Sequence, residues 1–258
     1  MPKSVEEALA ANRFPTWLAN VVEDTKPKAQ AVANHEAWKR FADGTIPQTE
    51  HHTLLCGFWP LIERFPQFLA LNLLKCSYGS NAAVNAARGW LIKNLRIEQR
   101  HAEWYRDWAV CSGISQAKLF GGNQPAALTA ITDWCWHICE SGSLAEGMAA
   151  TNFAVEGVTG DWSEKVWESE VYRLLFKEAE RKKAMKWIQA HAAYDDLHPV
   201  EALGIIAQLL GDDPSKDNIL KIRRAIEKSY DLYVLALDEG MRALVGREQH
   251  QSRLVRAV

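Results

Sequence analysis

Three short stretches of this sequence place ionisable side chains where a helix would turn them toward an apolar interior. The first is Glu98-Gln-Arg-His101, whose glutamate and histidine fall on the same helical face as Leu91, Tyr105 and Trp108. A glutamate and a histidine three residues apart on a helix can offer a carboxylate and an imidazole to one metal ion. The same spacing is also common on solvated helix faces, so this pair alone is a weak indication.

The second stretch, Met148 to Gly157, is apolar apart from a few small polar residues and one carboxylate. Glu156 falls on the stripe formed by Ala149, Asn152 and Phe153. Because burying an unpaired carboxylate is very costly, an inward glutamate must be protonated, paired with a cation or bound to a metal. A salt bridge to an arginine or lysine remains open as the alternative to a metal.

The third stretch is the most informative, because it places two imidazoles and a carboxylate in one narrow sector of a single predicted helix. His191, Asp195 and His198 have the spacing i, i+4 and i+7, and they share this sector with the apolar side chain of Trp187. Asp196 points about 100° away, toward solvent. Three coincident ionisable groups on an apolar stripe favour a ligand set over isolated polar residues of the core.

Together the three stretches offer three carboxylates and three histidines. Nitrogen and oxygen ligands without a thiolate suit iron or manganese better than structural zinc. Six ligands are too many for one metal with open positions, but they fit two. Two divalent ions carry four positive charges against three carboxylates, so the remaining positive charge favours an anionic substrate.

Helical periodicity dominates the rest of the chain, since apolar residues recur three and four apart and few runs alternate. One helix is expected from about 47, opened by a Thr45–Gln48 capping box and kinked or broken at Pro60 and Pro66. A Ser143–Glu146 capping box opens another, which ends near 157 or 160. The other expected helices are 81–112, ending at Gly113; 125–140; 177–211, as one helix or two that break at Pro199; and 215–244. These elements predict a single all-α domain over 1–258, a bundle of seven to nine helices with flexible ends at 1–13 and 246–258.

Composition excludes several classes of protein. Among 258 residues, 30 Lys+Arg oppose 32 Asp+Glu, and the net charge of −2 gives no general attraction to nucleic acid or to an anionic membrane. Five cysteines without a CxxC pattern indicate a reducing compartment, and no apolar run approaches the ~18 residues of a membrane span. A cytoplasmic protein without nucleic-acid or membrane partners is therefore expected. The 11 tryptophans predict an unusually aromatic interior.

At the ligand positions the sequence resembles the haem-oxygenase-like diiron oxidases, whose pattern is a Glu/His pair, a lone later Glu and a His-x3-Asp-x2-His trio. The similarity extends from about Phe14 to Met241, and it is closest to the branch of fatty-acid decarboxylases that forms 1-undecene. The densest matches are Trp134–His137, Ala150–Gly157, Gly160–Ser163, Arg181–Trp187 and His198-Pro199.

The resemblance implies a haem-oxygenase-like (TenA-like) bundle that binds two Fe(II) ions, with O₂ as co-substrate and an external reductant. It implies the oxidative decarboxylation of a medium-chain saturated fatty acid, such as lauric acid, to a terminal alkene and CO₂, with removal of a hydrogen from C3. By the same resemblance, one iron is held by Glu98, His101 and His191, and the other by Glu156, Asp195 and His198. The expected partners are the fatty acid and an electron donor, and a homodimer is compatible with the sequence.

Other functions remain open at this stage. The same cofactor could act on an amino-acid-like substrate, as a desaturase-lyase or an N-oxygenase. A metal-free, thiaminase-type hydrolase would need a thiol such as Cys135 or Cys139, although both fit buried small side chains of an aromatic helix better. A helical protein that stores metal or binds a partner is the non-enzymatic alternative.

The remaining histidines are given structural or surface positions. We predict that His51 and His52 lie at the surface and that His35 and His137 are hydrogen-bonded structural residues.

Overall fold

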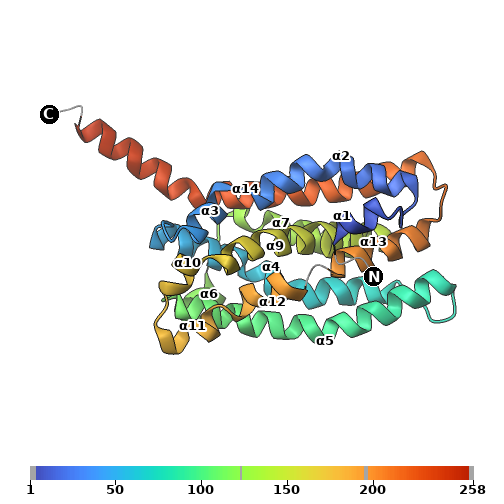
Figure 1. Cartoon of the computed structure of the whole chain (residues 1–258), viewed down its shortest axis with the longest axis horizontal. Coiled ribbons are helices and arrows are strands. Elements are labelled where there is room, and N and C mark those ends of the chain that lie inside the picture. The colour runs from blue at the N-terminus through green and yellow to red at the C-terminus, as the bar shows by residue number, and fades with distance from the viewer. Residues whose placement is uncertain (1–3, 123, 195–196, 256–258) are drawn as a thin grey trace.

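The computed structural model describes residues 4–122, 124–194 and 197–255, with the backbone alone for 193–194 and 243–255, and every regular element in these ranges is helical (Figure 1). The elements are α1 (Val5–Ala10), α2 (Thr16–Ala33), α3 (Glu36–Ala42), α4 (Gln48–Leu74), α5 (Ala82–Cys111), α6 (Gln116–Gly121), α7 (Ala126–Ser141), α8 (Leu144–Met148), the π-helix η1 (Ala149–Val155), α9 (Glu156–Glu168), α10 (Glu170–Leu174), α11 (Glu178–Ala184), α12 (Lys186–Tyr194), α13 (Leu197–Leu210) and α14 (Lys216–Val255). The predicted all-α, single-domain architecture is confirmed.

The long helices run roughly parallel to the long axis of the molecule and form a bundle (Figure 1). Helix α4 packs between α5 and α7, and α14 packs against α2, α7 and η1. The last part of α14 extends beyond the end of the bundle, so this helix continues past the expected end near Leu244 (Figure 1). Across the described ranges, none of the helices combines the length and the apolar character that a transmembrane span needs.

Several helix boundaries follow the local sequence signals. Helix α5 starts where the Asn81 side chain accepts a hydrogen bond from the Val84 amide, and it ends before Gly113, whose φ of +88° favours glycine. The Ser143–Glu146 capping box is present with both of its hydrogen bonds. The predicted helices 81–112 and 125–140 are therefore confirmed to within a residue or two.

Three predictions about local structure are wrong. The Thr45–Gln48 capping box does not form, since Pro47 is the N-cap of α4 and makes no side-chain cap. Neither Pro60 nor Pro66 breaks α4, because the long buried face of this helix outweighs the hydrogen bonds that the two prolines remove; a kink at these residues stays a prediction. Pro199 does not end a helix; it lies in the first turn of α13, where its missing N–H has no helical partner to lose.

Aromatic side chains form the centre of the bundle, as the tryptophan content predicted. Trp38 from α3 stacks on Trp162 from α9, with ring centroids 3.8 Å apart, and Trp162 stacks in turn on Trp187 from α12 at 5.7 Å. Trp187 also stacks on Trp108 from α5 at 5.5 Å. These buried rings tie four helices together directly beside the residues considered below.

The close contact between α14 and α4 at Gly240 gives a test of this packing. A Cβ added at Gly240 would overlap the buried Leu54 side chain. We expect Gly240→Ala to lower the free energy of unfolding by about 1–2 kcal/mol, since overpacking exceeds the gain in helix propensity. Gly204→Ala in α13 is the matched control, because an added Cβ there meets nothing within 4 Å; it should stabilise by about 0.5–1 kcal/mol. Urea unfolding of both variants measures the difference, and equal stabilities would contradict the described contact.

Candidate metal centre

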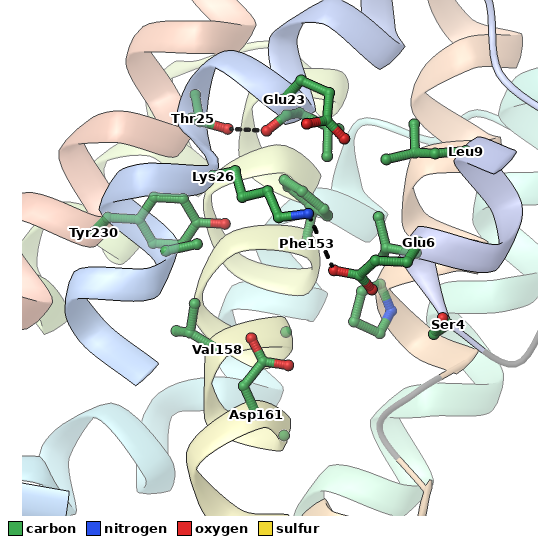
Figure 2. A pocket seen from close by; sticks show the side chains of 16 residues that line it. Ser4, Glu6, Leu9, Glu23, Thr25, Lys26, Phe153, Val158, Asp161 and Tyr230 are labelled. Atoms are coloured by element: carbon green, nitrogen blue, oxygen red, sulfur yellow. Dashed lines mark hydrogen bonds and ion pairs between the residues drawn. The ribbon is translucent and has the colours of Figure 1, made fainter. Parts of the chain in front are cut away.

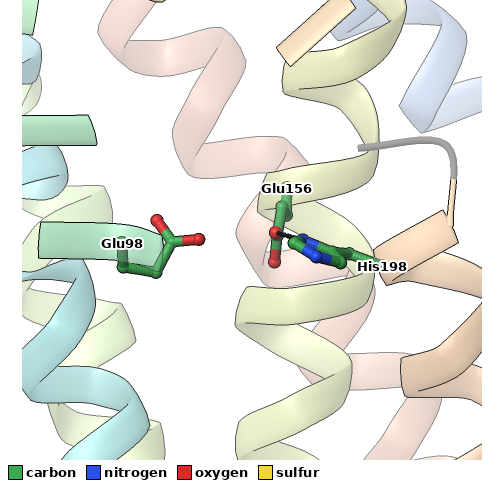
Figure 3. A group of neighbouring side chains, drawn as sticks. All are labelled: Glu98, Glu156 and His198. Carbon is green, nitrogen blue, oxygen red and sulfur yellow. Dashed lines mark hydrogen bonds and ion pairs between the residues drawn. The ribbon is translucent and has the colours of Figure 1, made fainter. Parts of the chain in front are cut away.

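Three of the six predicted ligands meet in the interior of the bundle. Ligand atoms of Glu98, Glu156 and His198 all lie within 4.8 Å of one another, and all three side chains are buried. Glu98 extends from α5 toward the Glu156–His198 pair on α9 and α13 (Figure 3). Carboxylates and an imidazole converging from three helices in a dry interior form a group that could bind a metal ion.

Glu98 and His101 form a second contact beside this group. The His101 Nδ1 atom lies 2.9 Å from Glu98 Oε2. The two atoms are not aligned as a hydrogen bond, and Nδ1 is a buried nitrogen without a hydrogen-bond partner. Burial raises the pKa of Glu98, and nearby Glu156 raises it further while His101 opposes both. A cation between the two side chains would satisfy the orphaned nitrogen and offset the cost of burying the carboxylate.

Glu156 follows directly on the π-helix η1, a wider turn that is often found at functional sites. Its Oε1 atom lies 2.6 Å from Nδ1 of His198, and its Oε2 atom accepts a hydrogen bond from Nδ2 of Asn152 at 3.1 Å. Burial alone would lower the pKa of His198, but the charge and hydrogen bond of Glu156 outweigh it and raise this pKa to about 9. The contact with Glu156 therefore favours the protonated form of the His198 imidazole.

His191 lines the same cavity from α12 and is prepared to act as a neutral ligand. Its Nδ1 atom donates a hydrogen bond to the Trp187 carbonyl at 2.8 Å, which places the ring's lone pair on Nε2. The rings of His191 and His101 lie with their centroids 4.6 Å apart and are tilted by 52° to one another. Burial, with nearby His101 adding to it, holds the pKa of His191 well below its ordinary value.

The predicted His-x3-Asp-x2-His trio is not carried by one helix in the described residues. His191 belongs to α12 and His198 to α13, and Asp195 lies outside the described residues. Both histidines nevertheless reach the site, because α12 packs on α9 and α5 while α13 packs on η1 and α5. The assignment of Asp195 as a ligand stays a prediction.

The cavity beside these residues is small and has an apolar wall. It is lined by Leu61, Ile62, Phe65, Val155 and Thr159 together with Glu98, His101, Glu156 and His191. Its open space of about 20 Å³ is that of roughly one water molecule. A larger ligand therefore requires wall side chains such as Phe65 to move.

A wider pocket is lined by residues of α1, α2, α9 and α14 (Figure 2). Its walls include Lys26, whose Nζ atom lies 3.8 Å from the Glu6 carboxylate of α1, and Asp161 of α9. Gly157 and Pro199 also line this pocket, and each is the direct neighbour of a predicted ligand. None of the five predicted ligands that the structure describes lines this pocket, so it is distinct from the cavity at the candidate metal centre.

Sequence reasoning missed the residues that support the ligands. Asn152 holds Glu156 and is itself held by the Thr151 hydroxyl at 3.1 Å. Glu201 accepts a hydrogen bond from the Trp90 indole at 2.6 Å and helps to raise the pKa of His198. The spacing could have revealed both residues. Asn152 precedes Glu156 by four residues and Glu201 follows His198 by three, and side chains three or four residues apart on a helix are neighbours.

The predictions for the other histidines have mixed outcomes. The prediction of a surface position for His51 is wrong, because this side chain is 9% exposed and hydrogen-bonded to Tyr172. His52 is half-buried and bonded to the Ser112 carbonyl. His35 is a hydrogen-bonded structural residue, as predicted, which caps α3 and pairs with Asp238. His137 is exposed, contrary to the structural role predicted for it.

Cys135 and Cys139 are fully buried in α7. Burial raises the pKa of Cys135 well above its ordinary value, and burial raises that of Cys139 to about 12. A catalytic thiol needs the opposite shift and access to substrate. Both cysteines are therefore packing residues here, as the sequence favoured.

Asn152 provides a test of the support given to Glu156. Loss of a hydrogen bond that orients a metal ligand costs about 10–100-fold in metal affinity or activity. We expect a loss of this size in the Fe(II) affinity of Asn152→Ala, measured by anaerobic titration. Asn72→Ala removes another fully buried amide, away from the ligands, and should leave the affinity unchanged. Equal affinities in the two variants would contradict the role given to Asn152.

Comparisons with known proteins identify the family and the fold. A family model described as an iron-containing redox enzyme matches residues 52–233. The crystal structure of a TenA homolog from Pseudomonas syringae pv. tomato is 37% identical, covers 90% of this chain and 95% of its own, and superposes with a TM-score of 0.88.

Two more distant structures share the fold. A haem-oxygenase-like domain of unknown function from Shewanella denitrificans is 12% identical, with 88% and 93% of the two chains covered and a TM-score of 0.70. A putative TenA-like thiaminase from Sulfolobus solfataricus is 15% identical, with 87% and 95% covered and a TM-score of 0.64. A search of curated proteins finds no significant match.

Proposed function

This chain belongs to the haem-oxygenase-like family of iron-containing redox enzymes, and we propose that it is a diiron, O₂-dependent decarboxylase that converts a medium-chain saturated fatty acid into a terminal alkene and CO₂. The observation that carries the proposal is the buried meeting of Glu98, Glu156 and His198 beside a cavity with an apolar wall. A redox metal and a hydrocarbon chain are the two ligands that such a combination suits.

The donor set fits two ferrous ions. Glu98, His101 and His191 would hold one of them, since the three side chains line one cavity and the buried Nδ1 of His101 lacks a hydrogen-bond partner. Glu156 and His198, with Asp195, would hold the other. Iron bound by these residues would supply electrons for the reduction of O₂ and the oxidising power to remove a hydrogen from C3 of the substrate.

The charges and walls of the site favour a fatty acid over an amino-acid-like substrate. Among the described residues, the ionisable ones that line the cavity are Glu98, Glu156 and two histidines, all of them predicted ligands. This described part of the wall offers no additional carboxylate to hold an ammonium group. The positive charge left over by two divalent ions and three carboxylates would instead attract the carboxylate end of a fatty acid.

The apolar wall of the cavity indicates where the hydrocarbon chain of the substrate would lie. Ile62 belongs both to the cavity at the ligands and to a second cavity, which is lined almost entirely by aromatic and aliphatic side chains such as Phe58 and Trp162. This second cavity has only about 10 Å³ of open space. A chain that leaves the metal centre past Ile62 would have to displace these side chains, and it would remain in apolar surroundings. These walls also exclude water from the reacting carbon.

The electron count defines one further requirement. Conversion of a saturated acid to an alkene and CO₂ releases two electrons and two protons, whereas reduction of O₂ to two water molecules consumes four of each. An external donor must therefore supply two electrons per turnover, which implies a reductant or an electron-transfer partner.

The proposal is tested by a direct assay. Purified protein is loaded anaerobically with Fe(II), mixed with a reductant and a saturated acid from octanoic to palmitic acid, and exposed to O₂. We expect a terminal alkene one carbon shorter than the acid in the headspace, together with CO₂. If iron binds and O₂ is consumed but no acid yields an alkene, the iron site stands and the fatty-acid assignment fails.

A further inference from the structure

A row of aromatic rings leads from the metal centre to a buried tyrosine. The ring of His191 packs on Trp187 with centroids 3.8 Å apart, and Trp187 stacks on Trp108 at 5.5 Å with an interplanar angle of 19°. The indole N–H of Trp108 then donates a hydrogen bond to the hydroxyl of Tyr172 at 2.8 Å. Each neighbour in this row is in direct contact with the next.

The hydrogen-bond directions at Tyr172 are set by its partners. An indole N–H can only donate, so the Tyr172 oxygen is an acceptor from Trp108. The hydroxyl proton of Tyr172 is then available to Nε2 of His51, which lies 3.1 Å away. Both side chains are buried, and Phe41 packs edge-on against the His51 ring.

The protonation states agree with this direction. Burial, with a smaller effect from neighbouring His52, lowers the pKa of His51 to about 3, so its imidazole is neutral and has a lone pair. Burial also raises the pKa of Tyr172 above its ordinary value, with the Trp108 hydrogen bond opposing. The pair at rest is thus a phenol that donates to a neutral imidazole. Removal of an electron makes a phenol strongly acidic, and its proton then has an acceptor in place.

Two other buried tyrosines near the same rings lack such an acceptor. The Tyr105 hydroxyl donates to the Leu55 carbonyl at 3.0 Å, although its ring lies 5.2 Å from that of Trp187. The Tyr233 hydroxyl accepts from the Trp162 indole and pairs with the Thr159 hydroxyl. A carbonyl and a hydroxyl are poor bases. Of these three tyrosines, only Tyr172 is placed to lose an electron and a proton together.

We propose that Tyr172 is a redox-active tyrosine that exchanges single electrons with the metal centre through Trp108 and Trp187, with His51 as its proton acceptor. In this step Tyr172 would lose one electron and its hydroxyl proton would move to His51 Nε2, while the electron would pass through Trp108 and Trp187 to an oxidised iron held by the ligands. The products are a neutral tyrosyl radical and an imidazolium. An external one-electron donor, such as ascorbate or a reduced iron–sulfur protein, restores the tyrosine, and the proton returns from His51.

The position of the Tyr172–His51 pair suits electron transfer between the interior and a donor outside the protein. The ring of His52 lies 6.2 Å from that of His51, and half-buried His52 bonds to the Ser112 carbonyl at the end of α5. An electron donor at this end of the bundle would not have to enter the substrate cavity. This inference rests on the proposed function, since the oxidising equivalent originates at the metal centre.

The first experiment uses metal-free protein and does not depend on iron. Cys111 is the one cysteine that is not buried, and a ruthenium photo-oxidant attached there is flashed in the presence of an electron acceptor. We expect a tyrosyl radical in the electron paramagnetic resonance spectrum. This signal should vanish in Tyr172→Phe and fall sharply in His51→Gln, while Tyr105→Phe and Tyr233→Phe retain it. An unchanged signal in Tyr172→Phe, or no tyrosyl radical in the wild type, would overturn the proposal.

The second experiment uses iron-loaded protein exposed to O₂ without substrate. In Tyr172→Phe the oxidising equivalent has no terminal donor, so peptide mass spectrometry should show several-fold more oxygen adducts on Trp187 and Trp108 than in the wild type. Wild-type adduct levels would contradict the connection between Tyr172 and the metal centre. If neither the wild type nor Tyr172→Phe binds iron, the proposed function fails, and the connection between Tyr172 and the metal centre fails with it. If iron binds and alkene forms without a Tyr172 radical, only the present inference fails.

Discussion

Replacement of His191 by alanine is expected to abolish alkene formation while the protein stays folded and helical. His191 lines the cavity at the candidate centre, is 5% exposed, and has its ring fixed by the hydrogen bond from Nδ1 to the Trp187 carbonyl. Loss of a residue that only supports a ligand costs about 10–100-fold, and loss of the ligand itself should exceed that range. Headspace analysis measures the activity, and circular dichroism measures the fold.

His137→Ala is the matched control for this variant. His137 is exposed on α7, outside the metal centre, and its removal should leave turnover and iron content unchanged. Turnover at the wild-type rate in His191→Ala would remove His191 from the ligand set. The same variant should also bind less iron, which separates loss of a ligand from a slower chemical step.

Trp187→Ala is expected to have the largest effect on stability, a loss of about 3–5 kcal/mol in the free energy of unfolding. The Trp187 ring is 1% exposed, and it contacts the rings of Trp108, Trp162 and Tyr105 as well as His191. Truncation to alanine would leave a cavity where three helices meet. Urea unfolding at equilibrium gives the loss.

Trp187→Phe distinguishes the destabilisation caused by a cavity from any destabilisation caused by the loss of the indole N–H. The Nε1 atom of Trp187 is buried without a hydrogen-bond partner, so phenylalanine gives up no hydrogen bond there. We expect Trp187→Phe to destabilise by clearly less than Trp187→Ala. If both variants lose less than about 1 kcal/mol, Trp187 is not a central packing residue.

The helices could be predicted from the sequence wherever a local signal ended them. Asn81 and Gly113 delimit α5, and the Ser143–Glu146 box opens α8. The prolines of α4 were misjudged because their cost is local, whereas the burial that outweighs it comes from helices distant in sequence. Pro199 was misjudged for a different reason: the same residue is compatible with the end or the first turn of a helix.

Three buried residues of the candidate site could be predicted from the sequence, whereas the residues that support them could not. Glu98, Glu156 and His198 were found because ionisable side chains on apolar stripes are rare, and the structure brings these three together. The π-helix before Glu156 and the change from α12 to α13 both alter the face on which a residue lies, and periodicity assumes one regular helix. The burial of His51 depends on Tyr172, 121 residues away, and no local pattern reveals such a partner.

The most direct test of the account is the iron content of the protein. Protein freed of metal is titrated anaerobically with Fe(II), passed through a desalting column and analysed for iron per chain, with Glu98→Ala and Glu156→Ala in parallel. The account predicts two irons per chain in the wild type and a clear loss in each variant, with unchanged helicity. Retention of no iron by the wild type, or equal iron in all three proteins, would contradict the assignment of this buried cluster as the metal centre.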